Sequence, residues 1–445
     1  MRSRTSREEL AIDTVRELWS HGYVAYLVGG CVRDRLLGTP PKDYDINTVA
    51  TPQQLLALFP HAQTVGAHFG VVLLTRGKDI HVEVATFRSE GAYSDGRRPD
   101  EVRFETDPAL DAQRRDFTIN GLMEDPLSGE VLDYVGGRAD LERRLIRAIG
   151  DPEKRFEEDH LRMLRAVRFA ARLNFAIEPS TAEAIRRQAS SIVKISAERI
   201  REELVRILTE GGARRGLELL DECGLLMHVL PEVKAFQGVP QPPEFHPEGD
   251  VWTHVLSMLD GLREPSPALA LGVLLHDVGK PPTFRVAERI RFDGHAEVGA
   301  EMTKQRLSQM RFSSEETEHV TALVANHMKF KDVRQMRLST LKRFLRLPRF
   351  EEHLELHRLD CLASNGYTDS YEFVRAKLAE LDREELRPPR LMSGRDLIEA
   401  GYKPGPHFAR ALEAVETAQL EGQIHSRAEA VALALSVLEE ATTPQ

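Results

Sequence analysis

The architecture of the chain is set at Leu27-Val28-Gly29-Gly30-Cys31-Val32-Arg33-Asp34, which is followed nine residues later by Asp43-Tyr44-Asp45. An apolar run precedes the two glycines and a helix-like segment follows them, so we expect a strand, a tight turn and a helix. Because side chains alternate along an extended strand, Asp43 and Asp45 are expected on the same face, roughly 7 Å apart along the backbone.

These residue types predict a phosphate site beside a metal site. Gly29 and Gly30 let the backbone approach a triphosphate and turn its N–H groups toward the anion, and Arg33 adds a fork of donors. Two aspartates can share divalent cations, and two cations about 4 Å apart can clamp the attacking and leaving oxygens of a phosphoryl displacement. Mg²⁺ commonly takes one or two carboxylates together with substrate phosphates. The combination indicates nucleotidyl transfer at a Mg²⁺ site.

Length and composition predict several domains, most of them helical. A chain of 445 residues exceeds what one hydrophobic core serves, so about two to four domains are expected. Strand patterns are confined to the front, at 23-28, 43-47, 70-76 and 80-87, after a helix at 8-20. Leu/Ala/Arg/Glu-rich segments beyond about residue 140 predict amphipathic helices. The expected fold class is α+β, with a small mixed-sheet head followed by helical domains.

The apolar runs and the cysteines of the sequence indicate the cellular compartment in which the protein is expected. No apolar run approaches the roughly 20 residues that span a bilayer, and the first residues lack a signal-peptide core. The three cysteines, Cys31, Cys223 and Cys361, have no paired spacing, which fits a reducing compartment. We therefore expect a cytoplasmic protein with no membrane partner.

The formal charge of −10 does not exclude a nucleic-acid partner, because binding needs only a local basic face. Such a face is predicted for 329-349, where eight basic residues stand against one acid. The candidate RNA-binding residues are Lys329, Lys331, Arg334 and Arg337.

Two further motifs concentrate charged residues. Arg114-Arg115-Asp116-Phe117-Thr118-Ile119-Asn120 follows a Gly/Asp/Arg-rich segment, 91-100, whose composition predicts a mobile loop. Glu158-Asp159-His160-Leu161-Arg162 opens a helix-like segment. A helical spacing of three would place Asp159, Arg162, Arg165 and Arg168 along one stripe.

In this order the motifs resemble those of class II tRNA nucleotidyltransferases, the bacterial CCA-adding family related to bacterial poly(A) polymerases. The resemblance covers the chain from about residue 20 to the end. It implies a polymerase β-like head followed by a helical neck, body and tail, and substrates that are the tRNA 3′ end, CTP and ATP.

The same resemblance implies roles by position. Asp43 and Asp45 would hold Mg²⁺, and Glu83 would be a third catalytic acid. The glycines and Arg33 would touch the triphosphate. Arg115 and Asp116 would contact phosphate and ribose, and Asp159 with Arg162 would read the incoming base. The nucleotide-binding set is Gly29, Gly30, Arg33, Arg115, Asp116, Asp159, Arg162, Arg165 and Arg168, the last two supporting that helix and reaching phosphate.

Hydrogen-bond chemistry agrees with the proposed base-reading pair. A carboxylate only accepts and a guanidinium only donates. Cytosine and adenine each offer an exocyclic amine beside an acceptor nitrogen, so one Asp/Arg pair satisfies both. Uracil and guanine invert that edge and would leave buried charged groups unpaired, at a cost of about 1–3 kcal/mol per group. Side chains could thus replace a nucleic-acid template.

A second set of candidate ligands follows residue 246: His254, His276, Asp277, His295, His327 and Asp360. Imidazole and carboxylate are ordinary ligands for Mn, Ni, Fe or Zn. With Gly279-Lys280 after the His-Asp pair, the set resembles the HD phosphohydrolase family, whose ligands come from separate helices and converge on one or two metals. We expect His254, His276, Asp277 and Asp360 to bind a divalent transition metal or Mg²⁺. His295 and His327 would bind a second metal or a phosphate, giving RNA-end or nucleotide phosphohydrolase activity.

The predicted domains are a nucleotidyltransferase head at 1-140, a base-recognising and RNA-binding neck and body at 141-240, an HD domain at 241-370 and a tail at 371-445 that grips the tRNA. A candidate loop at 93-104 favours addition of CCA, or of the terminal A alone, over addition of CC. A poly(A) polymerase is the nearest alternative. An alarmone synthetase/hydrolase and an RNA-binding protein with inactive sites are further ones. Oligomeric state does not follow from the sequence.

Overall fold

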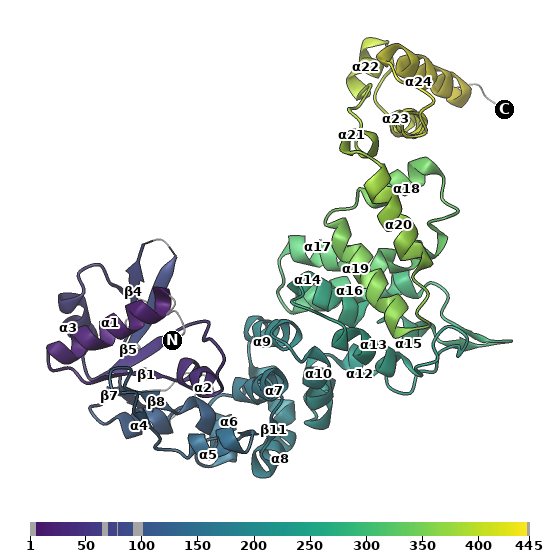
Figure 1. Cartoon of the computed structure of the whole chain (residues 1–445). Helices are drawn as coiled ribbons and strands as arrows, with labels where there is room; N and C mark the ends of the chain where they lie inside the picture. The colour runs from purple at the N-terminus through teal and green to yellow at the C-terminus, as the bar shows by residue number, and fades with distance from the viewer. Residues whose placement is uncertain (1–5, 65–69, 78, 92–100, 443–445) are drawn as a thin grey trace. The chain divides into compact units, whose positions relative to one another are not determined.

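The computed structural model describes residues 6–64, 70–77, 79–91 and 101–442 (Figure 1). It contains two compact units: Met1–Lys234 with Gln309–Arg311, and Ala235–Ser308 with Phe312–Gln445. The finer division at 1-140, 141-240, 241-370 and 371-445 stays a prediction. The loop expected at 93-104 lies largely outside the described residues, which resume at residue 101.

The first unit starts with a seven-stranded mixed sheet in the order β3-β4-β5-β2-β1-β8-β9. Its strands are β1 (Ala25–Val28), β2 (Asp45–Thr48), β3 (Gln63–Thr64), β4 (Val71–Arg76), β5 (Ile80–Thr86), β8 (Met123–Glu124) and β9 (Val131–Leu132). β2 runs antiparallel to β1 and parallel to β5, and this register places Asp45 beside Glu83. The four longest strands are those that the sequence predicts.

One face of this sheet is covered by α1 (Ser6–Ser20), with α3 (Pro52–Leu58) against the same core (Figure 1). Helix α1 buries Leu10, Val15 and Leu18 in a cluster that includes Leu27 and Val84 of the strands. Their spacing of three and five places them on one side of the helix. Helix α3 begins with a capping box between Thr51 and Gln54 and with Pro52 in its first turn.

The turn between β1 and α2 (Gly30–Leu36) confirms the strand-glycine-helix prediction. Gly29 has φ 72°, a conformation that costs little only for glycine. A Cβ atom there would lie 3.0 Å from Nη1 of Arg115. The turn is tied down because Gly29 N donates to the carbonyl of Leu122 at 3.1 Å. Glycine at position 29 therefore lets the turn pass close to a guanidinium.

The rest of the first unit is mostly helical. Helices α7, α9 and α10 pack on one another, and α6 packs on α8. The elements are β6 (Arg88–Glu90), β7 (Val102–Phe104), α4 (Pro108–Gln113), the 3-10 turn Thr118–Asn120, α5 (Gly137–Glu142), β10 (Leu145–Ile146), α6 (Pro152–Glu158), α7 (Leu161–Leu173), β11 (Ala176–Ile177), α8 (Pro179–Gln188), the 3-10 turn Ala189–Lys194, α9 (Ala197–Thr209), α10 (Ala213–Glu222), α11 (Leu226–Val229) and α12 (Pro231–Lys234).

The second unit is built around α14 (Pro267–Leu275), every residue of which after Pro267 is buried. Because the segment is apolar on all sides, it fits only at the centre of a helical bundle, and α13, α17 and α19 surround it. The helices are α13 (Val251–Asp260), α15 (Lys280–Thr283), α16 (His295–Gln309), α17 (Ser314–Asn326), α18 (Leu338–Leu345), α19 (Phe350–Ala363), α20 (Asp369–Glu380) and α21 (Arg383–Leu386), with a 3-10 turn at His327–Asp332.

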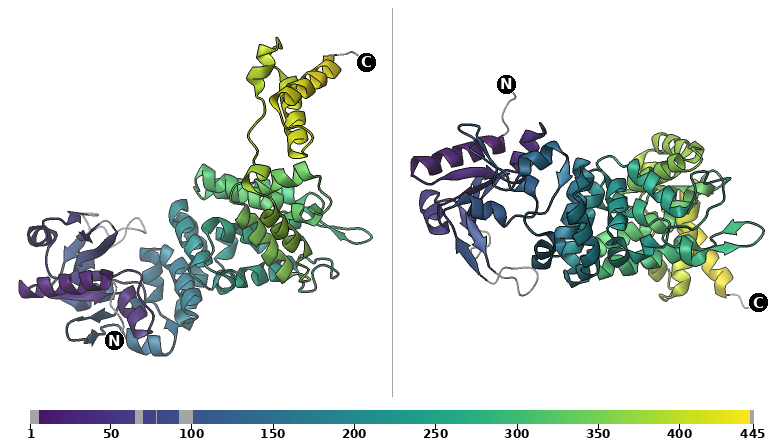
Figure 2. Two further views of the ribbon diagram at one scale, coloured as in Figure 1. Left: turned by 45° about the horizontal axis from the view of Figure 1, so that its top comes forward. Right: turned by 90° about the horizontal axis from the view of Figure 1, so that it is seen from below.

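A hairpin of β12 (Arg285–Val286) and β13 (Ile290–Arg291) extends beyond these helices (Figure 2). With β10 and β11 it corrects the expectation that strands are confined to the front. Two-residue strands are too short to leave an alternating pattern in the sequence.

The chain ends with α22 (Gly394–Glu399), α23 (Pro406–Leu420) and α24 (Arg427–Thr442), which pack around a hydrophobic cluster of their own. Along the described residues, no helix combines the length and the apolarity required to cross a membrane.

Candidate functional site

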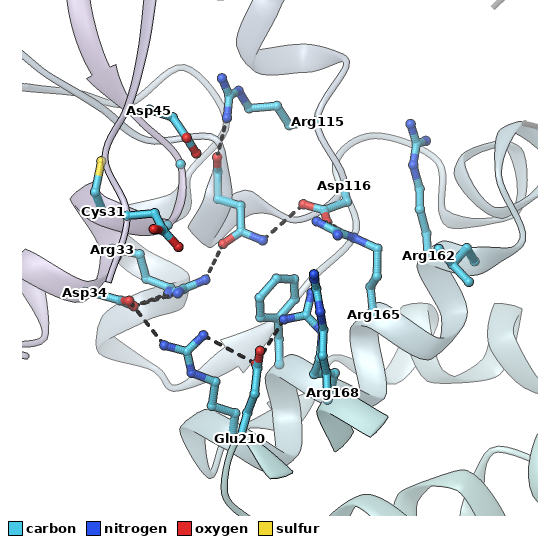
Figure 3. Close-up of a pocket in the computed structure, with 18 of the residues that line it drawn as sticks. Cys31, Arg33, Asp34, Asp45, Arg115, Asp116, Arg162, Arg165, Arg168 and Glu210 are labelled. Atoms are coloured by element: carbon cyan, nitrogen blue, oxygen red, sulfur yellow. Dashed lines mark hydrogen bonds and ion pairs between the residues drawn. The ribbon is translucent and has the colours of Figure 1, made fainter. Parts of the chain in front are cut away.

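A cavity of about 710 Å³ in the first unit brings the candidate residues of the head together (Figure 3). Every predicted nucleotide-binding residue lines it, and so do Asp43 and Asp45. The lining comes from the β1–α2 turn, the start of β2, the segment around Arg115, and helices α7 and α9. The sheet thus supplies the acids and the helices supply most of the arginines.

The acidic pair lies where the alternation predicts it. Asp43 and Asp45 are exposed on either side of the buried Tyr44. Asp45 is at the start of β2, where desolvation by the surrounding protein together with the neighbouring Glu83 raises its pKa to about 6. Crowded carboxylates of this kind fit a divalent cation, because its charge would relieve their repulsion. Glu83 itself is exposed and does not line the cavity.

Asp43 is held by the N-terminal helix. Nη1 of Arg7 donates to Oδ1 of Asp43 at 3.0 Å and to the carbonyl of Lys42 at 2.8 Å. The side chain of Asp43 is nevertheless 73% exposed, so a cation can reach its other oxygen.

Arg33 is fixed from two sides. Its Nε and Nη2 lie 2.7 and 2.6 Å from Oδ1 of Asp34, and Nη1 donates to Oδ1 of Asn120 at 2.6 Å. Burial lowers the pKa of the guanidinium. The predicted contact with a triphosphate would therefore come from a side chain that is already oriented and has most of its donors engaged.

Phe169 on α7 gathers three of the candidate arginines. The guanidinium carbons of Arg33, Arg165 and Arg168 lie 5.2, 5.4 and 4.3 Å from the ring centroid. A cation over an aromatic face is attracted by the negative ring surface. The ring therefore lies against three like charges in the wall of the cavity.

Asp116 is kept ionised. It accepts from Nε of Arg165 at 2.8 Å, from Nδ2 of Asn120 at 3.1 Å and from the backbone N–H of Phe117 at 2.8 Å. Burial raises the pKa of this carboxyl, but Arg165 and Asn120 outweigh it and bring the value to about 2. Asp116 thus presents an acceptor to the cavity over the whole physiological pH range.

The structure corrects the expected stripe of charge on α7. Asp159 is not on the helix: it has an extended conformation at the end of α6, two residues before α7 starts. The spacing rule fails there because His160 and Asp159 form the entry to the helix rather than its first turn. Only Arg162, Arg165 and Arg168 share the helical stripe.

Asp159 and Arg162 line the same cavity but have other partners. Arg199 of α9 contacts both carboxylate oxygens of Asp159, at 3.1 and 2.7 Å, and Leu161 N donates to Oδ1 at 3.0 Å. Nη1 of Arg162 donates to Oε2 of Glu158 at 2.5 Å and to the carbonyl of Arg155 at 3.1 Å. Each member of the predicted base-reading pair is therefore positioned by a separate neighbour.

Arg115 and Arg168 are also engaged by acids. Nη2 of Arg115 lies 3.2 Å from Asp111. Arg168 is buried, with Nε 2.7 Å from Glu203 and Nη1 3.2 Å from Glu210. Arg168 is thus tied to two carboxylates, so its contribution is more to the shape of the wall than to a direct phosphate contact.

The second unit holds the HD candidates, and its geometry suits metal binding. Among the described residues, three groups of ligands have atoms within 4.8 Å of one another, and all lie in this unit. They are His254 with His276 and Asp360, Asp277 with His295 and His327, and His246 with Glu248 and His254. The first two groups contain all six ligands expected from the sequence.

The histidines of this site all turn Nε2 inward. Nδ1 of His276, His295 and His327 donates to a backbone carbonyl three residues earlier, at 2.9, 2.9 and 2.6 Å. Such a bond fixes the tautomer and leaves Nε2 for a metal. Among the described residues, the buried Nε2 atoms of His254 and His276 face only carboxylate oxygens, of Asp360 at 3.3 Å and Asp277 at 3.1 Å, and neither forms a well-directed hydrogen bond. A bound cation would satisfy both the histidine nitrogens and the carboxylates.

The carboxylate of Asp277 lies between the two groups of ligands. Its Oδ2 lies 3.1 Å from Nε2 of His276, and its Oδ1 lies 3.6 and 3.8 Å from Nε2 of His295 and His327. Burial opposes ionisation of Asp277, but His276 and Lys280 hold its pKa well below the ordinary value. The carboxylate faces both groups, so it suits a bridging ligand rather than the first set alone.

Burial and charge act in opposite directions on two of the histidines. Burial lowers the pKa of His327 to about 3, so that it stays neutral and able to bind a metal. Burial also acts to lower the pKa of His254, but Asp360 and Glu248 outweigh it and raise the value to about 9. His254 lies 3.3 Å from Asp360.

The predicted RNA-binding residues do not form one free basic face. Arg334 donates to the carbonyl of Asp369 at 3.0 Å and lies over the ring of Phe373. Further along the same stretch, Arg343 and Arg346 pair with Glu416 of α23. Lys329, Lys331 and Arg337 are exposed. A count of charges does not show that three of the eight basic residues at 329–349, Lys342, Arg343 and Arg346, bond to α23.

Comparisons with known proteins match family domains in both units. Residues 25–147 match the poly A polymerase head domain, 174–237 match a probable RNA and SrmB-binding site of polymerase A, and 251–359 match the HD domain. A CCA-adding enzyme of Geobacillus stearothermophilus is 46% identical over 216 residues, 48% of this chain and 53% of that protein. The Bacillus stearothermophilus CCA-adding enzyme in complex with CTP aligns over 98% of this chain and 99% of its own, with TM-score 0.75 and 28% identity.

The chain thus carries a poly A polymerase head domain and an HD domain, and it is similar to CCA-adding enzymes. The expected mixed-sheet head with helical domains is confirmed by the match to the Bacillus stearothermophilus structure. Another similar protein, poly(A) polymerase I of Salmonella typhi, is 42% identical over 244 residues, 53% of this chain and 52% of that protein. The chain spans about half the length of these curated relatives. A Thermotoga maritima CCA-adding enzyme complexed with tRNA shares the fold, with TM-score 0.56 and 18% identity.

The motifs of the family left several site residues unnamed. Arg199 lines the head cavity from α9 and contacts Asp159, 40 residues earlier, and Glu203 of the same helix pairs with Arg168. Nothing in their local sequence distinguishes the two residues. Glu248 accepts from Nδ1 of His246 and His254, at 2.9 and 2.7 Å. Lys280 lies 2.6 Å from Asp277. Its place after the His-Asp pair was the one available signal.

Proposed function

We propose that the chain is a tRNA 3′-end nucleotidyltransferase that adds CCA, or the terminal A, from CTP and ATP without a nucleic-acid template. The observation that carries the proposal is the head cavity, where Asp43 and Asp45 share one lining with a wall of arginines. Carboxylates suit Mg²⁺ and guanidinium groups suit a triphosphate. The CCA-adding enzymes among the relatives, one of them bound to CTP, support the same substrate class.

Different residues of the cavity would bind the metal, the phosphates and the ribose. Mg²⁺ held by Asp43 and Asp45 would supply charge neutralisation and activate the attacking RNA hydroxyl. Arg33 and Arg165, which lie against Phe169, would stabilise the charge on the phosphates. Asp116, held as an anion by Arg165, would accept from a ribose hydroxyl.

Base selection would rest on Asp159 and Arg162. Asp159, oriented by Arg199, would accept from the exocyclic amine of cytosine or adenine, and Arg162 would donate to N3 or N1. Uracil and guanine present the opposite pattern, so both would leave charged groups unpaired. We expect Asp159→Ala and Arg162→Ala to lose discrimination against UTP and GTP. Discrimination retained in both variants would contradict this assignment.

Nucleotide incorporation into two tRNAs tests the activity. A CCA-adding enzyme incorporates CTP into tRNA lacking CCA and ATP into tRNA ending in CC, whereas an A-adding enzyme uses only the second. Asp43→Asn and Asp45→Asn should abolish incorporation. Asp79→Asn is the matched control, because that acid is exposed in the turn before β5 and outside the cavity. Incorporation by both cavity variants at the wild-type rate would contradict the proposal.

A poly(A) polymerase is the second candidate, favoured by the 42% identity to the Salmonella enzyme. It predicts long adenylate tails on RNAs other than tRNA. Alarmone synthesis and hydrolysis remain a more distant alternative, because the HD unit usually comes first in that class and here it follows the head.

For the second unit we propose a phosphohydrolase site that uses a divalent transition metal or Mg²⁺. His254, His276 and Asp360 would hold one ion, His295 and His327 a second ion or a phosphate, and Asp277 would face both. Elemental analysis of the purified protein and of His276→Ala tests this proposal. The variant should lose metal, and equal metal content in the two proteins would count against it.

A further inference from the structure

Five of the six HD ligands, all except His254, line a cavity of about 510 Å³ whose rim extends well beyond them. Part of the rim is the β12–β13 hairpin, which contributes Arg289, Ile290 and Arg291. Figure 2 shows this hairpin projecting from the helices of its unit. A phosphate bound at the metal ligands would leave the rest of the cavity available to whatever the phosphate is attached to.

The rim is positively charged and its charges are not neutralised internally. Arg289, Arg291 and Lys331 line the cavity and are exposed. Within the described part of the chain, none of these three side chains forms an ion pair or a hydrogen bond. This differs from Arg343 and Arg346, which both pair with Glu416 of α23. The rim also includes one acidic residue from the segment after β13, Asp293.

The rim also presents aromatic surfaces to solvent. Tyr367 is 74% exposed and Phe245 is 52% exposed, and both line the same cavity. Exposed flat rings beside unpaired cations are the combination that binds single-stranded nucleic acid: the cations follow the backbone phosphates and the bases stack on the rings. Stacking is worth about 1–3 kcal/mol per base and tolerates any sequence.

We propose that this rim is a binding subsite for a single-stranded RNA segment, with Arg289 and Arg291 on its backbone phosphates and Tyr367 and Phe245 under its bases. The inference rests on the proposed phosphohydrolase and gives it a substrate class: the end of an RNA strand rather than a free nucleotide. Arg285 provides an internal comparison, since it is an exposed arginine on the same hairpin, in register with Arg291, but does not line the cavity.

Hydrolysis of two substrates by the full-length protein tests the subsite. The substrates are an RNA octamer ending in a 2′,3′-cyclic phosphate and bis(p-nitrophenyl) phosphate, each with the metal that the purified protein retains. The double variant Arg289→Ala/Arg291→Ala should lower kcat/KM for the octamer at least tenfold more than for the small ester, and Arg285→Ala should leave the ratio unchanged. A double variant with the wild-type ratio, or an Arg285→Ala variant with the same loss, overturns the proposal.

Salt dependence adds a second readout. Each phosphate contact with a single strand contributes about 0.7 to the slope of log affinity against log salt. Removal of two such contacts should therefore reduce the slope of log(1/KM) for the octamer by about 1.4, which corresponds to roughly 25-fold at 0.1 M salt relative to 1 M. A loss that is independent of salt would mean that the arginines do not contact phosphates.

Photo-crosslinking separates failure of the subsite from failure of the hydrolase. An octamer carrying 4-thiouridine should crosslink to peptides that contain Tyr367 or residues 285–291, in wild type and in Arg285→Ala but not in the double variant. If neither substrate is hydrolysed with any divalent metal, the phosphohydrolase proposal falls while these crosslinks still decide the subsite. Absence of crosslinks to those peptides in the wild type overturns the proposed RNA-binding subsite.

Discussion

Arg199 holds both carboxylate oxygens of Asp159, and its removal should loosen the choice between bases. In Arg199→Ala the carboxylate keeps one hydrogen bond, from Leu161 N to Oδ1 at 3.0 Å. The two hydrogen bonds from Arg199, of 3.1 and 2.7 Å, fix the plane of the group and are absent from the variant. A carboxylate free to rotate can no longer distinguish an amine from a carbonyl at one defined position.

The size of the effect follows from the environment of the Arg199–Asp159 pair. The two side chains are 21% and 14% exposed, so the pair is partly shielded from water. A hydrogen bond to a charged group in such a place is worth about 1.5–3 kcal/mol. At about 1.4 kcal/mol for each factor of ten, the ratio of kcat/KM for CTP over UTP should fall roughly tenfold to a hundredfold.

The assay is single-nucleotide incorporation into tRNA lacking CCA, with CTP and UTP in separate reactions. Arg215→Ala is the matched control: this arginine lies 2.7 Å from Glu222, but the pair is exposed and outside the cavity. The control should keep the wild-type ratio because exposed ion pairs contribute little. If Arg199→Ala selects CTP as strictly as the wild type and has the same melting temperature, the orientation of Asp159 by Arg199 does not govern base choice.

Three further changes have defined outcomes. Phe169→Leu should raise KM for CTP and ATP several-fold in steady-state incorporation, because cation–π contacts worth about 0.5–2 kcal/mol hold the arginine wall; an unchanged KM would mean that the ring does not order the wall. Gly137→Ala should cost about 1–3 kcal/mol and lower the melting temperature, since its Cβ would lie 2.2 Å from the carbonyl of Thr118. Glu178→Gln should destabilise the fold by about 1 kcal/mol at pH 7, because the carboxylate caps α8. Burial acts to raise the pKa of Glu178, but hydrogen bonds from Ser180 and Thr181 outweigh it and lower the folded value from 4.5 to about 2. The difference in melting temperature between wild type and Glu178→Gln should therefore be complete above about pH 5 and vanish as the pH falls toward 2. A difference that is independent of pH would exclude this titration.

The local parts of the structure follow from the sequence. The strand, glycine turn and helix around Gly29 depend on neighbours in the chain, and so does the alternation that exposes Asp43 and Asp45 around Tyr44. In these cases the periodicity of the element already fixes the direction of the side chain. The HD ligands were predicted from the His276-Asp277 pair and the resemblance to HD phosphohydrolases, and the structure brings all six into two adjacent groups.

Choices between partners did not follow from the sequence. Arg199 could pair with many acids, and only the packing of α9 against α7 brings it to Asp159. Arg162 finds Glu158 four residues earlier, although the family motif joins it to Asp159. The ion-pair partner of each arginine depends on how the helices pack against one another. Neither the net charge nor the residue spacing contains that information.

The separate hydrophobic cluster of α22, α23 and α24 has a consequence for how the gene can change. Residues such as Leu397, Phe408 and Ala434 bury one another and need nothing from the sheet or from the bundle around α14. A substitution inside this cluster should therefore destabilise the last three helices without changing the packing of the sheet in the head. A replacement of the segment would have to reproduce the contacts that α23 makes with Lys342, Arg343 and Arg346.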